Sequence, residues 1–244
     1  MLLLLDFGNT RLKYFIGEAN TICESGRFNT ADLWDELQAL QQKYPALSQA
    51  VASDVSGVLS SAAWNKHMQL PLLMVDAAKL QLPFSTRYTT VHTLGQDRVA
   101  LLAGAQEHYP NTDLLLIDMG SCITYDVLES GKRYVGGAIS PGWRMRVEAM
   151  HEFTSKLPSL QPSEPMTVLG DTTASCMQIG AYNGVLGELQ ELIRAYRKRF
   201  EDLTVILTGG DAEIFGKRLK NCIFAHSNFL LEGLHELLEY NSIR

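Results

Sequence analysis

The sequence opens with MLLLLDFGNTRLK (residues 1–13), and this stretch decides the fold. An apolar run leads into Asp6, and after the Gly8-Asn9 pair apolar and polar residues alternate. A short apolar run followed by a Gly-Asn turn predicts a buried strand and its hairpin partner. Turn N–H groups can cradle phosphate oxygens, while a carboxylate at the strand end holds a cation directly or through water. Taken alone, the pattern also fits an ordinary first hairpin with a solvated aspartate.

A second copy of this pattern lies near the middle of the chain, in LLLIDMGSCITYDVL (residues 114–128). It again has apolar residues, an aspartate, one spacer, a glycine, a small hydroxyl residue and an alternating strand, so that Asp118 matches Asp6. A repeat of about half the chain predicts two similar domains. We expect an N-terminal domain over residues 1–112 and a C-terminal domain over residues 113–244.

A third apolar strand, VILTGG (residues 205–210), ends in paired glycines. Paired glycines let a backbone approach a flat ligand such as adenosine, and Asp211 can cap the helix that follows. The order of two aspartate hairpins and a glycine pair resembles the actin-like ATPase superfamily. That resemblance implies an α/β fold of two ribonuclease-H-like domains, each a mixed sheet flanked by helices, with ATP in the cleft between them.

Composition narrows the class of protein. The net charge of −6 argues against a broad nucleic-acid or anionic-membrane surface. No apolar run approaches membrane-spanning length, and the first one is too short for a signal peptide and lacks a basic leader. Cys23, Cys122, Cys176 and Cys222 are scattered, which predicts reduced, mostly buried thiols in a cytoplasmic protein and no structural zinc.

Between the motifs, periodicity and turn residues predict the remaining elements. The polar, turn-rich segment 82–93 is expected to be an active-site loop, and the glycines of residues 136–142 mark a strand end and tight turn. Arg144 and Arg146, just beyond, could face a phosphate but are expected to line a solvated helix face. The other expected elements are helices over residues 29–44, 99–109, 185–196 and 229–240, strands over 49–55 and 72–75, and a loop over 155–165. One of residues 170–173 is expected to cap the apolar helix that follows them.

The tetrapeptide Gly95-Gln96-Asp97-Arg98 begins a predicted helix. Asp97 falls on the first turn, where a carboxylate meets the positive end of the helix dipole. It could be only a helix-start residue with Arg98 as its solvated neighbour. An acid next to a base at a helix start could instead receive a hydroxyl-bearing, anionic substrate, with the Arg98 guanidinium paired to the substrate carboxylate.

The complete set of motifs has a more specific match. DFGNT with Lys13, Tyr88 seven residues before GQDR, IDMGS, GGAISPG, and GDTT before an apolar helix occur in this order. Together they resemble type III pantothenate kinase, from the first residue to the final helix. The resemblance implies phosphorylation of pantothenate by ATP, the first step of coenzyme A biosynthesis. It also implies a cytoplasmic homodimer that uses Mg²⁺ with ATP and a monovalent cation, K⁺ or NH₄⁺.

The resemblance also assigns roles to residues at matching positions. Asp97 is implied as the catalytic base, Asp118 as the monovalent-cation ligand, and Asp6 as the ligand of the divalent metal, through water. The implied ATP-binding residues are Asp6, Phe7, Gly8, Asn9, Thr10, Arg11, Leu12, Lys13 and Ser121. The implied substrate-binding residues are Tyr88, Gly95, Gln96, Asp97, Arg98 and Thr173.

This chain departs from the family pattern at a few positions. Ser121-Cys122 replaces the usual Thr-Ala, which keeps the hydroxyl but loses the methyl that fixes its rotamer. Trp143 and the residues after Thr173 are also less typical, which affects the shape of the pocket.

Three alternatives follow from the motifs: a sugar kinase or another small-molecule alcohol kinase on the same fold, a non-catalytic actin-like regulator or filament protein, and a protein kinase. The last is discarded, because Asp6-Phe7-Gly8 has no glycine-rich or catalytic loop before it.

Overall fold

The structure is a computed structural model that describes residues 1–8, 12–18, 21–28, 30–220, 222–224 and 229–242. It divides into two compact units. The first takes in Met1–Pro110, Gly131–Tyr134 and Ser227–Arg244, and the second takes in Asn111–Ser130 and Val135–His226. The division into domains at residue 112 stays a prediction, because compactness groups the closing helix with the first half of the chain.

The first unit contains a mixed five-stranded sheet in the order β3-β2-β1-β4-β5. The first hairpin is confirmed as an antiparallel pair, and β4 and β5 continue the sheet in parallel from β1. The strands are β1 (Leu2–Phe7), β2 (Leu12–Glu18), β3 (Thr21–Phe28), β4 (Gln49–Asp54) and β5 (Leu72–Met74). The short β6 (Ser85–Thr86) pairs in parallel with the first residues of β9 (Arg133–Pro141), which belong to the same unit.

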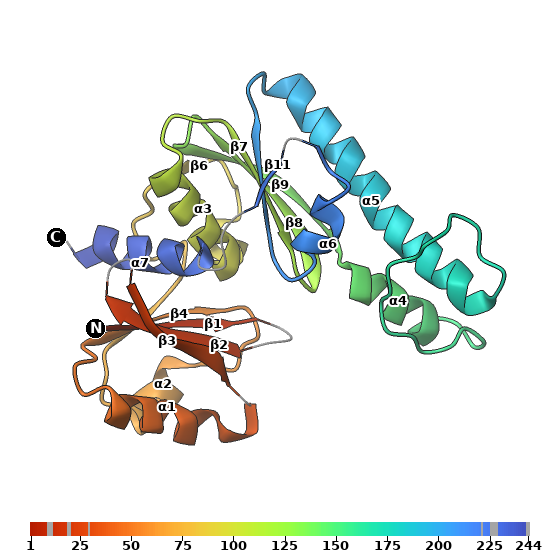
Figure 1. Ribbon diagram of the computed structural model, residues 1–244. Coiled ribbons are helices and arrows are strands. Elements are labelled where there is room, and N and C mark those ends of the chain that lie inside the picture. The colour runs from red at the N-terminus through yellow and green to blue at the C-terminus, as the bar shows by residue number, and fades with distance from the viewer. Residues whose placement is uncertain (9–11, 19–20, 29, 221, 225–228, 243–244) are drawn as a thin grey trace. The chain divides into compact units, whose positions relative to one another are not determined.

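Helices α1 (Leu33–Lys43) and α2 (Ser61–His67) cover one face of this sheet (Figure 1). Alternation along β1 points Leu3, Leu5 and Phe7 into the core beneath these helices. Asp6 therefore belongs to the other face, on which α3 (Gln96–His108) and α7 (Phe229–Ser242) pack. The predicted helix at 29–44 is confirmed as α1 preceded by a 3-10 turn over Thr30–Asp32; Asn29 lies outside the described residues.

The backbones of α3 and α7 lie in direct contact where the two helices cross. A Cβ added to Gly233 would lie 1.8 Å from the Ala100 carbonyl oxygen, and one added to Gly104 would lie 3.0 Å from the Phe229 carbonyl oxygen. Only glycine fits such a contact without displacing a helix. Helix α7, which is far from α3 in the sequence, therefore packs closely on α3, the helix that begins with the predicted catalytic segment.

The second unit repeats the arrangement around the second hairpin, with strand order β11-β10-β7-β8-β9. β7 and β8 are antiparallel, while β10 and β11 run parallel to β7. Its further strands and helices are β7 (Leu114–Met119), β8 (Cys122–Glu129), β10 (Thr204–Thr208), β11 (Cys222–Phe224), α4 (Trp143–Glu152), α5 (Thr173–Arg199) and α6 (Ala212–Gly216). The core stripe of α5 packs on this sheet through residues such as Tyr182, Val185 and Leu189.

Two expectations about exposure and turns are wrong. Cys23 and Cys176 are exposed and Cys122 and Cys222 half-buried, so the thiols are not mostly buried, although all four are free. β9 runs through residues 136–141 and ends at Pro141, so the predicted strand end is confirmed and the predicted tight turn is wrong. A Cβ on Gly137 would lie 1.6 Å from the Tyr125 carbonyl oxygen, so this glycine serves close strand packing.

Candidate active site

The first hairpin places Asp6 at the carboxyl end of β1 with Lys13 opposite it on β2. Asp6 is only 8% exposed, and the Lys13 Nζ lies 3.4 Å from its Oδ2. Burial raises the pKa of Asp6 above its ordinary value, and the neighbouring Lys13 ammonium opposes that rise. A buried carboxylate kept close to one cation is suited to the metal-bearing end of a nucleotide. The predicted phosphate-loop residues Asn9, Thr10 and Arg11 lie outside the described residues.

Ser53 lies beside Asp6 on the other side of β1. The two are register partners in the parallel pair of β1 and β4, so their side chains share the face toward α3. Ser53 is fully buried, and among the described residues its hydroxyl oxygen has no hydrogen-bond partner. Buried hydroxyls are nearly always paired. Sequence reasoning missed Ser53, because nothing in a Val-Ala-Ser-Asp strand end distinguishes this serine.

The predicted catalytic segment is tied to the same strand end. The Gln96 side-chain oxygen accepts a hydrogen bond from the Asp54 backbone N–H at 2.8 Å, which fixes the start of α3 next to the end of β4. Asp97 follows on the first helical turn, as predicted, and is half-buried. Its Oδ1 accepts from the Arg98 N–H at 2.8 Å. A Cβ on Gly95 would lie 2.6 Å from that oxygen, so glycine leaves room for the carboxylate.

Arg98, the residue that follows Asp97, is not solvated. Arg98 is 4% exposed, and its Nη2 donates to the Tyr134 hydroxyl at 2.7 Å. The predicted substrate contact Tyr88 stacks on Tyr134, with ring centroids 5.7 Å apart, and faces the Arg98 guanidinium. Tyr88, Gly95, Gln96, Asp97 and Arg98 therefore lie in one unit around the start of α3.

In the second unit, Asp118 is the second-to-last residue of β7, as Asp6 is of β1. Its register partners are Thr124 on β8 and Thr208 on β10. The Thr124 hydroxyl oxygen is buried and, within the described part of the chain, has no hydrogen-bond partner. A Cβ on Gly209, which has φ +93°, would lie 2.5 Å from the Asp118 Oδ1. The predicted adenosine motif thus packs against the predicted cation ligand.

Two further glycine-containing segments meet this hairpin. The Gly142 N–H donates to the Ser121 carbonyl at 3.0 Å, and a Cβ on Gly142 would lie 2.5 Å from the same oxygen. The Asp211 N–H donates to the Met119 carbonyl at 3.1 Å, which joins the segment after Gly210 to the end of β7. Ser121 and the glycine pair 209–210 therefore lie around one strand end, and their roles toward ATP stay predictions.

Thr173 is the first residue of α5 and is exposed. Its neighbour Thr172 is the N-cap, in a reciprocal capping box with Ser175, so the predicted cap is confirmed. Because Thr172 performs the capping, the Thr173 hydroxyl is not required for it. The role of Thr173 as a substrate contact stays a prediction.

A polar network in the second unit corrects the expectation for Arg146. Instead of lining a solvated face, Arg146 forms an ion pair with Glu188 on α5, whereas Arg144 does pair with Glu148 on the exposed side. Glu188 also accepts from the Ser140 hydroxyl at 2.5 Å and from the Tyr125 hydroxyl at 2.8 Å. Burial raises the pKa of Glu188, but the bonds from Ser140, Arg146 and Tyr125 outweigh it and lower the pKa below its ordinary value.

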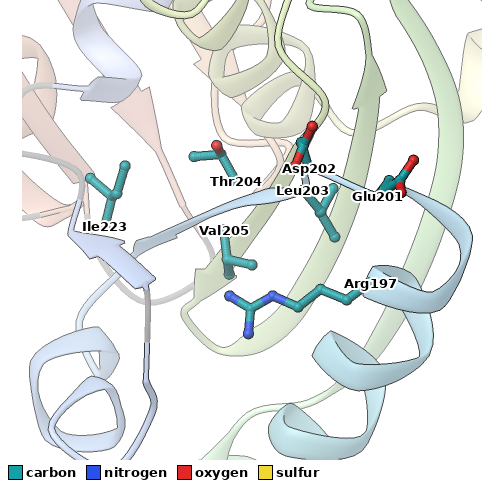
Figure 2. A pocket seen from close by; sticks show the side chains of 7 residues that line it. All are labelled: Arg197, Glu201, Asp202, Leu203, Thr204, Val205 and Ile223. Carbon is teal, nitrogen blue, oxygen red and sulfur yellow. The ribbon is translucent and has the colours of Figure 1, made fainter.

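The structure also has a hollow that no motif predicted. It has a volume of about 460 Å³ and lies at the amino end of β10, opposite to the end that carries Gly209 (Figure 2). None of its lining residues is a predicted site residue, so it is separate from the predicted nucleotide contacts. The lining residues are Arg197, Glu201, Asp202, Leu203, Thr204, Val205 and Ile223.

The donor set fits the metals that the resemblance implies. Mg²⁺ is usually bound by one or two carboxylates together with water and substrate phosphates, and Asp6 offers one buried carboxylate. Asp118 offers an oxygen ligand for a monovalent cation, beside the buried Thr124 hydroxyl. No group of three or more His, Cys, Asp or Glu side chains that could form a ready-made metal site occurs among the described residues.

None of the helices within the described ranges is both long and apolar enough to span a membrane.

Comparison with known sequences gives one family. The sequence profile described as type III pantothenate kinase matches residues 2–195. A type III pantothenate kinase of Christiangramia forsetii is 43% identical over 241 residues, which cover 99% of each chain. One of Flavobacterium johnsoniae is 40% identical over 240 residues, which cover 98% of each.

Comparison with solved structures gives the fold. A Campylobacter jejuni protein assigned to the Baf family of transcriptional activators superimposes with a TM-score of 0.66 at 18% identity, covering 98% of both chains. MreB5 of Spiroplasma citri, solved bound to ADP, matches with a TM-score of 0.53 at 8% identity, covering 96% of this chain and 94% of its own. With two mixed sheets flanked by helices, the chain has a fold of the actin-like ATPase type.

Proposed function

Since the chain belongs to the type III pantothenate kinase family, it is a pantothenate kinase of coenzyme A biosynthesis, and we propose that Asp97 is its general base. The observation that carries this proposal is the start of α3, where a half-buried carboxylate lies next to the buried Arg98. Gln96 fixes that turn to the end of β4. A carboxylate and a guanidinium in this arrangement can receive the hydroxyl and the carboxylate of one anionic alcohol.

The proposed reaction is an in-line transfer of the γ-phosphoryl group of ATP. The pantothenate primary hydroxyl oxygen forms a bond to the γ-phosphorus while the bond to the β-phosphate oxygen breaks and ADP leaves. The hydroxyl proton passes to the Asp97 carboxylate. Phosphoryl transfer depends mostly on positioning and charge stabilisation, and a general base adds ~10²–10⁴-fold.

The remaining residues bind and orient the two substrates. We assign Arg98 to the pantothenate carboxylate, because a guanidinium matches a carboxylate in geometry and charge. Lys13 and the turn after Asp6 are assigned to the ATP phosphates, and Gly209-Gly210 to adenosine. Mg²⁺, when bound to ATP near Asp6, neutralises charge on the phosphate oxygens. Asp118 is assigned to a monovalent cation, K⁺ or NH₄⁺.

The direct test is incubation of the purified protein with ATP, Mg²⁺ and pantothenate, with and without K⁺. We expect ADP and phosphopantothenate in equal amounts, and faster turnover with K⁺. A panel of alcohols, including sugars, tests the alternative of another small-molecule kinase. Turnover of a sugar but not of pantothenate would overturn the substrate assignment. Nucleotide binding without turnover of any alcohol would favour a non-catalytic regulator.

We also propose a homodimer. Apolar side chains gather from the end of α4 to the segment before α5, and large exposed apolar surfaces mark interfaces. Phe153 is 85% exposed, Met166 100% and Leu169 84%. We expect sedimentation equilibrium to give twice the chain mass for the wild type, and a monomer for the double variant Met166→Asp, Leu169→Asp. A monomeric wild type would overturn the proposal.

The enzyme is further proposed to act in the cytoplasm, which cell fractionation tests.

A further inference from the structure

Arg98 lies in an aromatic environment that fixes its charged group. A guanidinium that is removed from water is costly unless its N–H groups are hydrogen-bonded and its charge is compensated. Arg98 is 4% exposed; its Nη2 donates to the Tyr134 hydroxyl at 2.7 Å, and its Cζ lies 5.8 Å from the centre of the Tyr88 ring. Both contacts restrict the plane of the guanidinium.

Tyr134 is itself held rigidly. It is fully buried at the start of β9, and its carbonyl accepts from the Arg87 N–H at 3.2 Å. Its ring stacks on Tyr88 at an interplanar angle of 27° and meets the edge of Phe84 at 73°, with centroids 6.4 Å apart. A ring packed in this way leaves its hydroxyl only one position, so the Arg98 Nη2 has a fixed acceptor.

We propose that Tyr134 is a positioning residue that sets the selectivity of the enzyme for a substrate carboxylate. Its hydroxyl accepts from the Arg98 Nη2 and so holds the plane of the guanidinium that we assign to the substrate carboxylate. A planar guanidinium distinguishes a carboxylate from a neutral group only if its N–H fork is aligned. This inference rests on the proposed role of Arg98. No motif pointed to Tyr134, because it comes before the glycines of β9.

The test is Tyr134→Phe, which removes the hydroxyl and keeps the ring. We expect KM for pantothenate to rise roughly tenfold, since the lost bond involves a charged donor, with kcat and KM for ATP within about twofold of wild type. The decisive readout uses pantothenol, in which CH₂OH replaces the carboxylate. The preference for pantothenate over pantothenol, as a ratio of kcat/KM, should fall by about the same factor. If Tyr134 had a merely structural role, the substitution would lower kcat/KM for both substrates by the same factor and leave the preference unchanged.

Tyr182→Phe is the matched control, because Tyr182 is also buried and its hydroxyl donates to a carboxylate, that of Glu164, at 3.2 Å. We expect it to leave the preference unchanged. In an Arg98→Ala background, Tyr134→Phe should produce no further change in the preference. Should Tyr134→Phe fail to fold, Phe84→Leu loosens the same ring and is expected to reduce the preference in part.

The outcomes separate the two hypotheses. If the wild-type enzyme phosphorylates pantothenate and Tyr134→Phe retains the full preference, Tyr134 does not position Arg98 and the inference is wrong. An equal loss of preference in Tyr182→Phe would also overturn it. If the wild-type enzyme does not prefer pantothenate to pantothenol, the proposed role of Arg98 fails first.

Discussion

Lys13 and Thr124 occupy equivalent places in the two hairpins: each is the antiparallel register partner of the aspartate near the end of the first strand. In the first hairpin the partner brings an ammonium group to 3.4 Å from Asp6. In the second hairpin the partner of Asp118 brings only a hydroxyl. The two hairpins therefore differ in the charge of the register partner, and Asp118 is the aspartate that we assign to the monovalent cation.

Asp118→Asn is therefore expected to change the response to K⁺. Loss of the carboxylate charge should raise the K⁺ concentration for half-maximal activity at least tenfold, because a neutral amide binds a cation more weakly. The measurement is a K⁺ titration of the rate at saturating ATP and pantothenate. Glu148→Gln on the exposed side of α4 removes one negative charge elsewhere in the same unit and should not move the midpoint. An unchanged midpoint in Asp118→Asn would remove this residue from the cation site.

Asp97→Asn should abolish most of the turnover without unfolding the protein. An amide keeps the size of the side chain and its hydrogen bond from the Arg98 N–H, but it cannot accept the substrate proton. We expect kcat to fall by ~10²–10⁴-fold, with ATP affinity and the thermal midpoint close to wild type. Stopped-assay kinetics, calorimetric ATP binding and circular dichroism measure the three quantities. Near-normal turnover would contradict the base assignment.

Asp6→Asn is expected to stabilise the protein while weakening the binding of MgATP. Because burial raises the pKa of Asp6 above its ordinary 3.8, the folded state holds this proton more tightly than the unfolded chain. The free energy of unfolding falls as pH rises from 3.8 through the folded pKa, and the penalty is complete once the pH exceeds the folded pKa. Asparagine cannot ionise, so it removes this penalty, which amounts to about 1.4 kcal/mol for each unit by which burial raises the pKa of Asp6. Urea unfolding from pH 4 to 8 and MgATP titration measure both effects.

The control for Asp6→Asn is Asp76→Asn, where the sign is opposite. The Lys79 ammonium and the Ala78 N–H lower the pKa of Asp76, so its charge stabilises the fold above pH 3.8. This variant should lose stability at neutral pH rather than gain it. A loss of stability in Asp6→Asn as well, or unchanged MgATP binding, would disagree with the environment described for Asp6.

Ser53→Ala should leave the stability unchanged or raise it by up to about 1 kcal/mol, because it deletes a buried hydroxyl that has no partner among the described residues. Ser56→Ala is the comparison: its hydroxyl donates to the Asp54 carboxylate at 2.7 Å, and its loss should cost about 1 kcal/mol. Denaturant unfolding of both variants gives the difference. A larger loss in Ser53→Ala than in Ser56→Ala would mean that the Ser53 hydroxyl is paired in solution.

Gly233→Ala should destabilise the first unit by about 1–3 kcal/mol, since its Cβ would overlap the Ala100 carbonyl oxygen. Gly180→Ala, within α5, is the matched control, because a Cβ there meets no atom within 4 Å. It should raise stability by up to about 1 kcal/mol through helix propensity. Thermal unfolding of the two variants compares them directly, and equal shifts would contradict the close crossing of α3 and α7.

The sequence predicted what short-range patterns encode. Both hairpins, the first turn of α3 and the cap of α5 follow from apolar runs, turn residues and capping side chains. Relations across the chain were not predictable: the packing of Gly233 on α3, the pairing of Arg146 with Glu188, and the contact of Tyr134 with Arg98 join segments that lie tens of residues apart. A solvated Arg98 was a reasonable alternative from the sequence, because burial of an arginine depends on such distant partners.

The placement of α7 bears on the order in which the polypeptide matures. Residues 111–130 and 135–226 make up the second unit, while the last helix completes the first. During synthesis the second unit is available to fold before the Gly104–Gly233 crossing can form, although its residues come later than those of the first sheet. The helix that begins at Gln96 receives its cover from α7 only after the second unit has been synthesised. A chain truncated before Phe229 would therefore leave α3, which carries the proposed base Asp97, without this support.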